Sequence, residues 1–109
     1  MPRKRSQTVL NNDLPSIQKM ELSDEQMTSY LSDLFAGATR MVIRVKDSAQ
    51  SDYRMMSRLA ELHVAILNKH IWSAELAYTY EGRQWVDQLE IQPQTTRVNR
   101  QQQRAILIA

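Results

Sequence analysis

Apolar residues recur at helical spacing in the stretch Ser23-Asp-Glu-Gln-Met-Thr-Ser-Tyr-Leu-Ser-Asp-Leu-Phe-Ala-Gly-Ala-Thr-Arg-Met-Val-Ile-Arg-Val45. Ser23 followed by Gln26 is a capping-box pattern, and Asp24 and Glu25 favour the positive end of a helix dipole. We therefore expect a long helix with one apolar stripe of about five turns. The stripe can pack against another subunit or against a later helix of the same chain. Its members are Met27, Leu31, Leu34, Phe35, Ala38, Met41, Val42 and Val45.

The middle of the chain predicts a second helix and an extended segment. Polar residues 46–52 interrupt the first pattern, and apolar spacing predicts a helix over 53–70. Apolar and polar residues then alternate over 72–80, which indicates a strand or extended segment. Glu81 and Gly82 should turn the chain after it.

The last part of the chain predicts two more helices. Trp85, Val86 and Leu89, at i, i+1 and i+4, indicate a short helix that ends before Pro93, and a final helix is expected from Arg97. The predicted fold class is therefore mainly α, with one long N-terminal helix. We expect three parts: a flexible basic lead over 1–22, a helical dimerisation and partner-binding domain over 23–92, and a basic C-terminal arm or helix over 93–109.

Length and composition narrow the class of protein. The 109 residues suit one domain with a modest core, so a partner subunit is plausible. The chain has no cysteine, which excludes disulfides and thiolate catalysis within it and fits a reducing cytoplasm. No apolar run has the length of a membrane helix, and no apolar stretch follows the basic residues near Met1. We expect a cytoplasmic protein.

Charge is distributed unevenly along the chain. Residues 6–96 carry 8 basic and 12 acidic side chains, a net charge of −4. An acidic body with basic ends suits contact with a polyanion through those ends. The alternative is that the basic ends only maintain solubility. The basic residues at the two ends are Arg3, Lys4, Arg5, Arg97, Arg100 and Arg104.

Residues that could support catalysis or metal binding are sparse. His63 and His70 are two helical turns apart, about 10 Å by helical rise, which is too far for one metal. Gly37 and Gly82 are the only glycines, so a glycine-rich phosphate loop is excluded. We expect no enzyme activity and no cofactor in this chain. A small enzyme or metal-binding bundle that uses the two histidines is a rival interpretation.

Aromatic residues gather between the predicted second helix and the short helix near 85. Aromatic rings interleaved with arginines can stack on nucleic-acid bases, but only Arg83 lies among these rings. A hydrophobic core or a subunit interface is therefore the better prediction. The residues are Trp72, Tyr78, Tyr80 and Trp85.

The C-terminal stretch offers a candidate DNA-binding surface. In a helix, Arg97, Arg100 and Arg104 would form one stripe, without an acidic residue among them. Arginine suits guanine or phosphate, and the neighbouring Asn and Gln amides suit adenine. The alternative is a solvated amphipathic helix that docks on a partner through Val98, Ala105 and Ile106.

Three stretches, in order, resemble the FlhD family, the D subunit of the FlhD/FlhC flagellar master activator. The first is Leu31-Ser-Asp-Leu-Phe-Ala-Gly-Ala-Thr-Arg-Met-Val-Ile-Arg-Val-Lys-Asp-Ser-Ala49, which is similar to that family's long first helix. The second is Tyr78-Thr-Tyr-Glu-Gly82, and the third is Gln94-Thr-Thr-Arg-Val-Asn99.

The resemblance implies a mainly helical, interlocked homodimer that joins a zinc-containing FlhC-like partner. Such a complex binds double-stranded promoter DNA and recruits RNA polymerase. The chain lacks the family's intersubunit cysteine and has a shorter central region. In this it resembles the divergent FlhD-like activators of conjugative plasmids and integrative elements, which would switch on transfer genes instead of flagellar genes.

Two sets of site residues follow from these interpretations. The resemblance assigns DNA contact to the segment 96–99, and the basic stripe adds Arg100 and Arg104. A protein interaction adaptor or anti-activator that never contacts DNA is the alternative function. The DNA-binding set is Thr96, Arg97, Val98, Asn99, Arg100 and Arg104. The dimer and partner interface set is Leu31, Leu34, Phe35, Met41, Trp72 and Tyr78.

Overall fold

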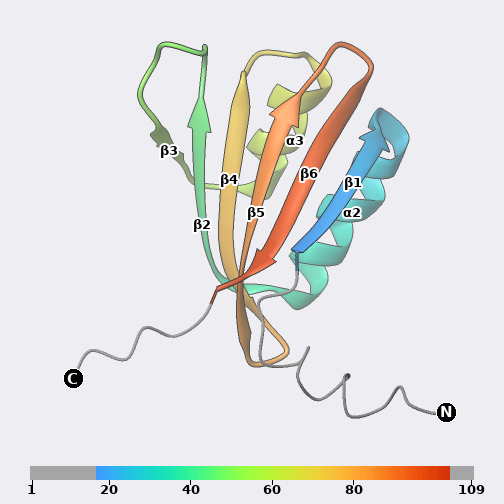
Figure 1. The fold of residues 1–109 in the computed structure, drawn as a ribbon, viewed down its shortest axis with the longest axis vertical. Coiled ribbons are helices and arrows are strands. Elements are labelled where there is room, and N and C mark those ends of the chain that lie inside the picture. The colour runs from blue at the N-terminus through green and yellow to red at the C-terminus, as the bar shows by residue number, and fades with distance from the viewer. Residues whose placement is uncertain (1–16, 104–109) are drawn as a thin grey trace, which may run out of the picture.

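The computed structural model of the chain describes residues 17–103 and places them in two layers. One layer is a six-stranded antiparallel sheet with strand order β1-β6-β5-β4-β2-β3. Both helices lie on one face of this sheet (Figure 1). The elements are β1 (Ile17–Ser23), α2 (Asp24–Gly37), β2 (Thr39–Lys46), β3 (Arg54–Met56), α3 (Leu59–Leu67), β4 (Ser73–Tyr80), β5 (Arg83–Ile91) and β6 (Thr95–Gln102).

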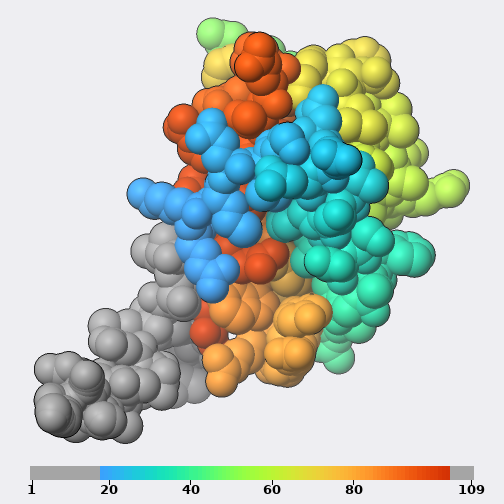
Figure 2. Space-filling view, turned by 90° about the vertical axis from the view of Figure 1, so that its right-hand side faces the viewer, coloured from blue at the N-terminus to red at the C-terminus, as the bar shows by residue number. Residues whose placement is uncertain are grey.

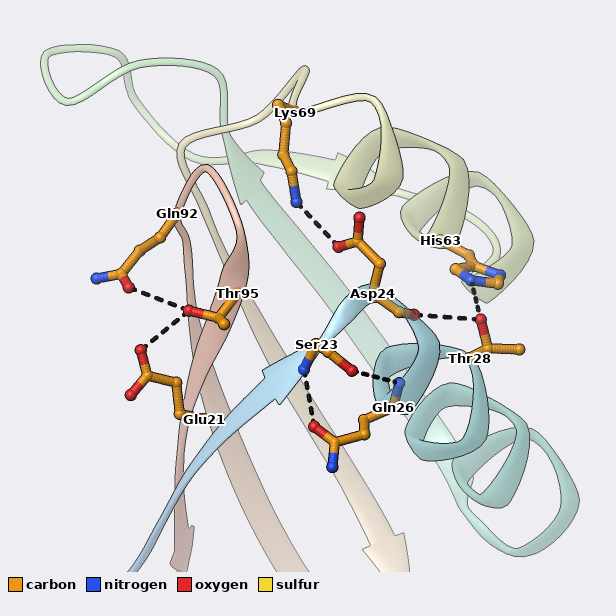
Figure 3. Close-up of polar contacts among 9 residues, drawn as sticks. All are labelled: Glu21, Ser23, Asp24, Gln26, Thr28, His63, Lys69, Gln92 and Thr95. Atoms are coloured by element: carbon orange, nitrogen blue, oxygen red, sulfur yellow. Dashed lines mark hydrogen bonds and ion pairs between the residues drawn. The ribbon is translucent and has the colours of Figure 1, made fainter.

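The prediction of a mainly α fold is wrong, because strands outnumber helices and form the larger layer. The predicted start of the first helix is confirmed. Ser23 Oγ accepts a hydrogen bond from the Gln26 amide at 3.2 Å, and Gln26 Oε1 accepts one from the Ser23 amide at 2.9 Å (Figure 3). The first backbone N–H groups of a helix have no acceptor within the helix itself. This capping box supplies side-chain acceptors for two backbone N–H groups at that end.

The first helix is much shorter than predicted and ends at Gly37. Beyond it the apolar period changes from helical to two, so that Ile43 and Val45 face the helices while Val42 is exposed. Branched side chains fit a pleated strand better than a helix. A register shift between Thr39 and Val42 marks the start of β2. One sequence stripe is therefore divided between α2 and β2.

The middle of the chain confirms two predictions and shortens a third. The extended segment is strand β4, and Glu81 and Gly82 turn the chain with φ of 52° and 78°. Two consecutive residues with positive φ match the right-handed twist of a two-residue hairpin. The predicted second helix is reduced to α3, and part of its expected range is strand β3.

Strands β5 and β6 occupy the positions of the last two predicted helices, which is a second error. Trp85 and Leu89 are four residues apart, and an even spacing of four fits a strand face as well as a helix face. The N-terminal boundary also differs, because β1 begins at Ile17, inside the expected lead. Residues 1–16 and 104–109 lie outside the described part.

The hydrophobic core lies between the sheet and the two helices. Met27, Leu31 and Leu34 of α2 are buried against it, together with Leu62 and Ile66 of α3. The apolar stripe of α2 is thus buried mainly by the chain's own sheet. Within the described residues, neither helix has the length and apolar character needed to cross a membrane.

Side-chain contacts fix α2 relative to α3 (Figure 3). Lys69 Nζ, just after α3, lies 3.0 Å from Asp24 Oδ1 at the start of α2. One turn further along α2, Thr28 Oγ1 lies 3.1 Å from His63 Nε2. These contacts hold α2 at a defined position above the sheet.

Candidate functional site

A cleft of about 750 Å³ lies between α2 and the helix-facing side of the sheet. Its walls come from α2, β1 and the β4–β5 hairpin, together with Arg100 of β6. Figure 2 shows these elements around a hollow, with β1 in blue, α2 in blue-green and the hairpin in orange. This volume falls within the range of about 300 to 1,000 Å³ that is typical of small-molecule sites.

Aromatic and apolar side chains form much of the cleft lining. The rings are Tyr30, Tyr78, Tyr80 and Trp85, and the apolar side chains are Met20, Leu22 and Leu34. An ideal Cβ on Gly37 would lie 2.5 Å from Cε1 of the Tyr80 ring. A glycine at the end of α2 therefore allows this ring to pack closely against the helix.

A buried carboxylate, Asp87, lies beneath the cleft and is fully covered. Its Oδ2 accepts hydrogen bonds from Tyr30 Oη at 2.5 Å and from Tyr78 Oη at 2.9 Å. Arg100, its cross-strand neighbour on β6, donates from Nε to Oδ1 at 3.0 Å and from Nη2 to Oδ2 at 3.0 Å. This cluster connects α2 to three neighbouring strands at one point.

Three members of the cluster have raised pKa values. Burial, followed by the charge of Asp87, raises the pKa of Tyr30 well above its usual value. The same two causes raise the pKa of Tyr78. Burial opposes charging of Arg100, but its hydrogen bonds and attraction to Asp87 outweigh this and raise its pKa. At neutral pH the cluster contains two neutral phenols and one ion pair.

This arrangement favours binding over acid–base chemistry. Both Asp87 oxygens already accept hydrogen bonds, so a substrate proton would have to displace an existing donor. Tyr30 and Tyr78 donate their hydroxyl hydrogens to Asp87, which leaves their oxygens able only to accept. The cluster therefore gives the cleft a fixed base whose two phenol hydroxyls cannot donate to a bound molecule.

Trp85 contributes a polar group that is not satisfied. Its indole Nε1 is buried and has no hydrogen-bond partner among the described residues. A buried N–H without an acceptor is costly, so such groups are uncommon in folded proteins. Because Trp85 lies in the wall of the cleft, the indole N–H signal can report on a molecule bound there.

Alkaline pH should reveal the protected tyrosines. Because the folded-state pKa of Tyr30 lies above its unfolded value, its stabilising contribution is full below about pH 10 and is lost as the pH rises through the folded pKa. We expect folded wild type and Tyr30→Phe to have the same phenolate absorbance at about pH 11. The difference should appear only after denaturant is added. A difference in the folded proteins would contradict this burial.

The predicted DNA-binding residues do not form one stripe. In strand β6 they alternate between the two faces of the sheet, so the predicted helical arrangement is wrong. Thr96 and Val98 are fully buried, and Arg100 is paired with Asp87 below the cleft. Arg97 and Asn99 lie on the opposite face, where Arg97 Nη1 is 3.4 Å from Glu90 Oε1. Arg104 lies outside the described residues. DNA contact itself stays a prediction.

The predicted interface residues are mostly part of the chain's own core. Leu31, Leu34 and Tyr78 are buried, and Met41 packs partly buried against them. Phe35 and Trp72 are the exceptions, with 80% and 53% of their surface exposed. These two side chains alone from the set are open to a partner.

The two histidines lie in different environments. His63 contacts Thr28 of α2, whereas His70 follows α3 and lines a shallow groove beside it. Among residues 17–103, no group of three His, Asp or Glu side chains is arranged to hold a metal ion.

The local sequence patterns do not point to Asp87, Tyr30 or the cleft as functional. A signal was nevertheless present, because Trp85, Asp87 and Leu89 occupy every second position of β5 and share one strand face. A lone acidic residue on an otherwise apolar strand face indicates a buried charge that needs partners. The partners, on α2 and β6, could be found only from the tertiary structure.

No family model matches this chain, and neither the curated proteins nor the solved structures contain a match.

Proposed function

We propose that this chain is a non-catalytic binding protein whose cleft between α2 and the sheet holds a small ring compound. The observation that carries the proposal is an aromatic-lined cleft of about 750 Å³ above a fully hydrogen-bonded buried cluster. A rigid base and apolar walls reduce the ordering cost of binding. The unpartnered Trp85 indole lies in the same wall.

The test uses naphthalenemethanol, a neutral ring compound, with the full chain labelled with nitrogen-15. Trp72 and Trp85 are the only tryptophans, so two indole N–H signals are expected, and Trp72→Phe assigns them. The Trp85 signal should shift with saturation, whereas the Trp72 signal, outside the cleft, should not. No saturable shift of Trp85 would refute the proposal.

Neighbouring residues on opposite faces of β1 provide a matched pair of variants. Gln18 lines the cleft, whereas Lys19 points to the other face of the sheet. Gln18→Phe should fill the mouth and weaken naphthalenemethanol binding by about tenfold, because the ring would compete for the same volume. Lys19→Phe should bind as wild type does. Equal effects of both variants would place the ligand elsewhere.

DNA contact is a second proposed function, and one observation favours it. Ile17 and Gln101 are cross-strand partners, so the two basic chain ends join the sheet at neighbouring positions. Charges carried by both ends can therefore act on one polyanion. In this proposal the chain would serve as the DNA-binding subunit of an activator.

The salt dependence of duplex DNA binding tests this second function. Replacing Arg3, Lys4, Arg5 and Arg104 with serine should reduce the slope of log affinity against log salt by about 3 to 4 units. Fluorescence anisotropy with a labelled duplex measures it. Arg44→Gln, which breaks an ion pair with Glu75 elsewhere on the sheet, is the control. An unchanged slope in the serine variant would reject DNA contact through the chain ends.

A further inference from the structure

We propose that the cleft selects organic cations, namely arylalkylamines with a flat ring, over neutral or anionic ring compounds. This inference rests on the proposed binding function and adds the chemical class of the ligand. Three properties of the cleft carry it: its net charge, the hydrogen-bonding state of its tyrosines, and the size of its apolar wall.

The charges around the cleft leave one negative charge uncompensated. Arg100 is neutralised by Asp87, whose Oδ2 lies 3.0 Å from Arg100 Nη2. Closer to solvent, the cleft is lined by Asp33, Glu81 and Arg83. No ion pair among residues 17–103 involves these three side chains. Two carboxylates therefore face one guanidinium, which favours a cation over an anion.

The cleft is lined by electron-rich aromatic rings, two of which belong to tyrosines that cannot donate a hydrogen bond to a ligand. Tyr30 and Tyr78 have already donated their hydroxyl hydrogens to Asp87. Neither hydroxyl is therefore available to donate a hydrogen bond to an anionic ligand. The faces of aromatic rings also carry partial negative charge and attract organic cations. An anion would meet the same groups unfavourably.

The size and apolar wall of the cleft require an organic ligand. A metal ion or a lone ammonium would leave most of the roughly 750 Å³ unfilled. Met20, Leu22 and Leu34 provide an apolar surface beside the rings. A flat ring can cover this surface while its amino group approaches Asp33 and Glu81.

Three probes with the same ring and different charge test the selectivity. They are naphthylmethylamine, naphthalenemethanol and the carboxylate naphthaleneacetate, which are cationic, neutral and anionic at neutral pH. Titration of the Trp85 indole signal of the full chain gives each affinity. We expect the amine to bind about fivefold more tightly than the alcohol, and the acetate to bind most weakly. Added salt should weaken amine binding and leave alcohol binding unchanged.

Charge variants locate the effect. The combined Asp33→Asn and Glu81→Gln substitutions alter exposed side chains, so the fold should be retained, as circular dichroism can verify. They leave Arg83 as the unpaired charge of the lining, so the amine should bind no more tightly than the alcohol, and the acetate should gain affinity. Glu90→Gln on the opposite face is the control and should change neither.

The outcomes separate the two proposals. If the alcohol shifts Trp85 and the amine binds no more tightly, charge selection is wrong and the binding function stands. The same holds if the acetate binds best or if the double variant keeps the amine preference. If none of the three probes shifts Trp85, the binding function itself is rejected, and the inference falls with it.

Discussion

Asp87→Ala should lower the free energy of unfolding by about 3 to 5 kcal/mol, because it leaves a partly buried Arg100 without its counter-charge. It also removes the acceptor shared by the Tyr30 and Tyr78 hydroxyls. Unpaired buried polar groups cost far more than the net value of the bonds they once made. Urea denaturation followed by circular dichroism measures the change.

Two comparisons make the Asp87 result specific. Asp33→Ala removes an exposed carboxylate on the side of the cleft, and it should change stability by no more than about 0.5 kcal/mol. Arg100→Met added to Asp87→Ala should cost less than the sum of the two single substitutions, since the unpaired charge is then absent. A cost for Asp87→Ala as small as that for Asp33→Ala would show that the cluster does not stabilise the fold.

Val98→Asp should prevent stable folding, with a cost above about 4 kcal/mol. Val98 is fully buried on β6, an interior strand, opposite Leu89 on β5 and Met20 on β1. No cation is positioned directly opposite the new carboxylate on either neighbouring strand. Far-ultraviolet circular dichroism and thermal denaturation report the loss of the sheet.

Asn99→Asp is the matched control, because it places the same side chain one residue along on the opposite face. Asn99 pairs with Lys19 across β1 and β6, so the new charge has a cation nearby. Its effect should be within about 0.5 kcal/mol. If both substitutions were equally mild, residues 95–102 would not form an interior strand, and a separable arm would be the better description.

Local signals in the sequence predicted some element boundaries well. The Ser23 and Gln26 spacing located the start of α2, and the alternation before Glu81 and Gly82 located β4 and its turn. In these cases the physical cause lies within a few residues of the element itself. Caps and turns depend on local hydrogen bonds and on backbone angles, so a sequence read alone can show them.

The errors arose where two periods fit the same residues. Spacings of four residues in 85–89 satisfy both a helix and a strand, and only pairing with β4 and β6 decides between them. The candidate site was missed for the same reason. Asp87 becomes meaningful when β6 brings Arg100 opposite it and α2 brings Tyr30 above it. Those contacts join residues far apart in the sequence, which local patterns cannot indicate.

The pairing of β1 with β6 has a consequence for synthesis on the ribosome. Strand β1 cannot pair until β6 has been synthesised, because Ile17 to Ser23 pair with Thr95 to Gln101. While β6 is still in the exit tunnel, β1 lacks the one strand that it pairs with in the described sheet. The cleft also lacks the wall that contains Arg100. Helix α2 and the hairpins can form earlier, since their contacts are local. Closure of the domain, and with it any binding, therefore comes after translation of β6.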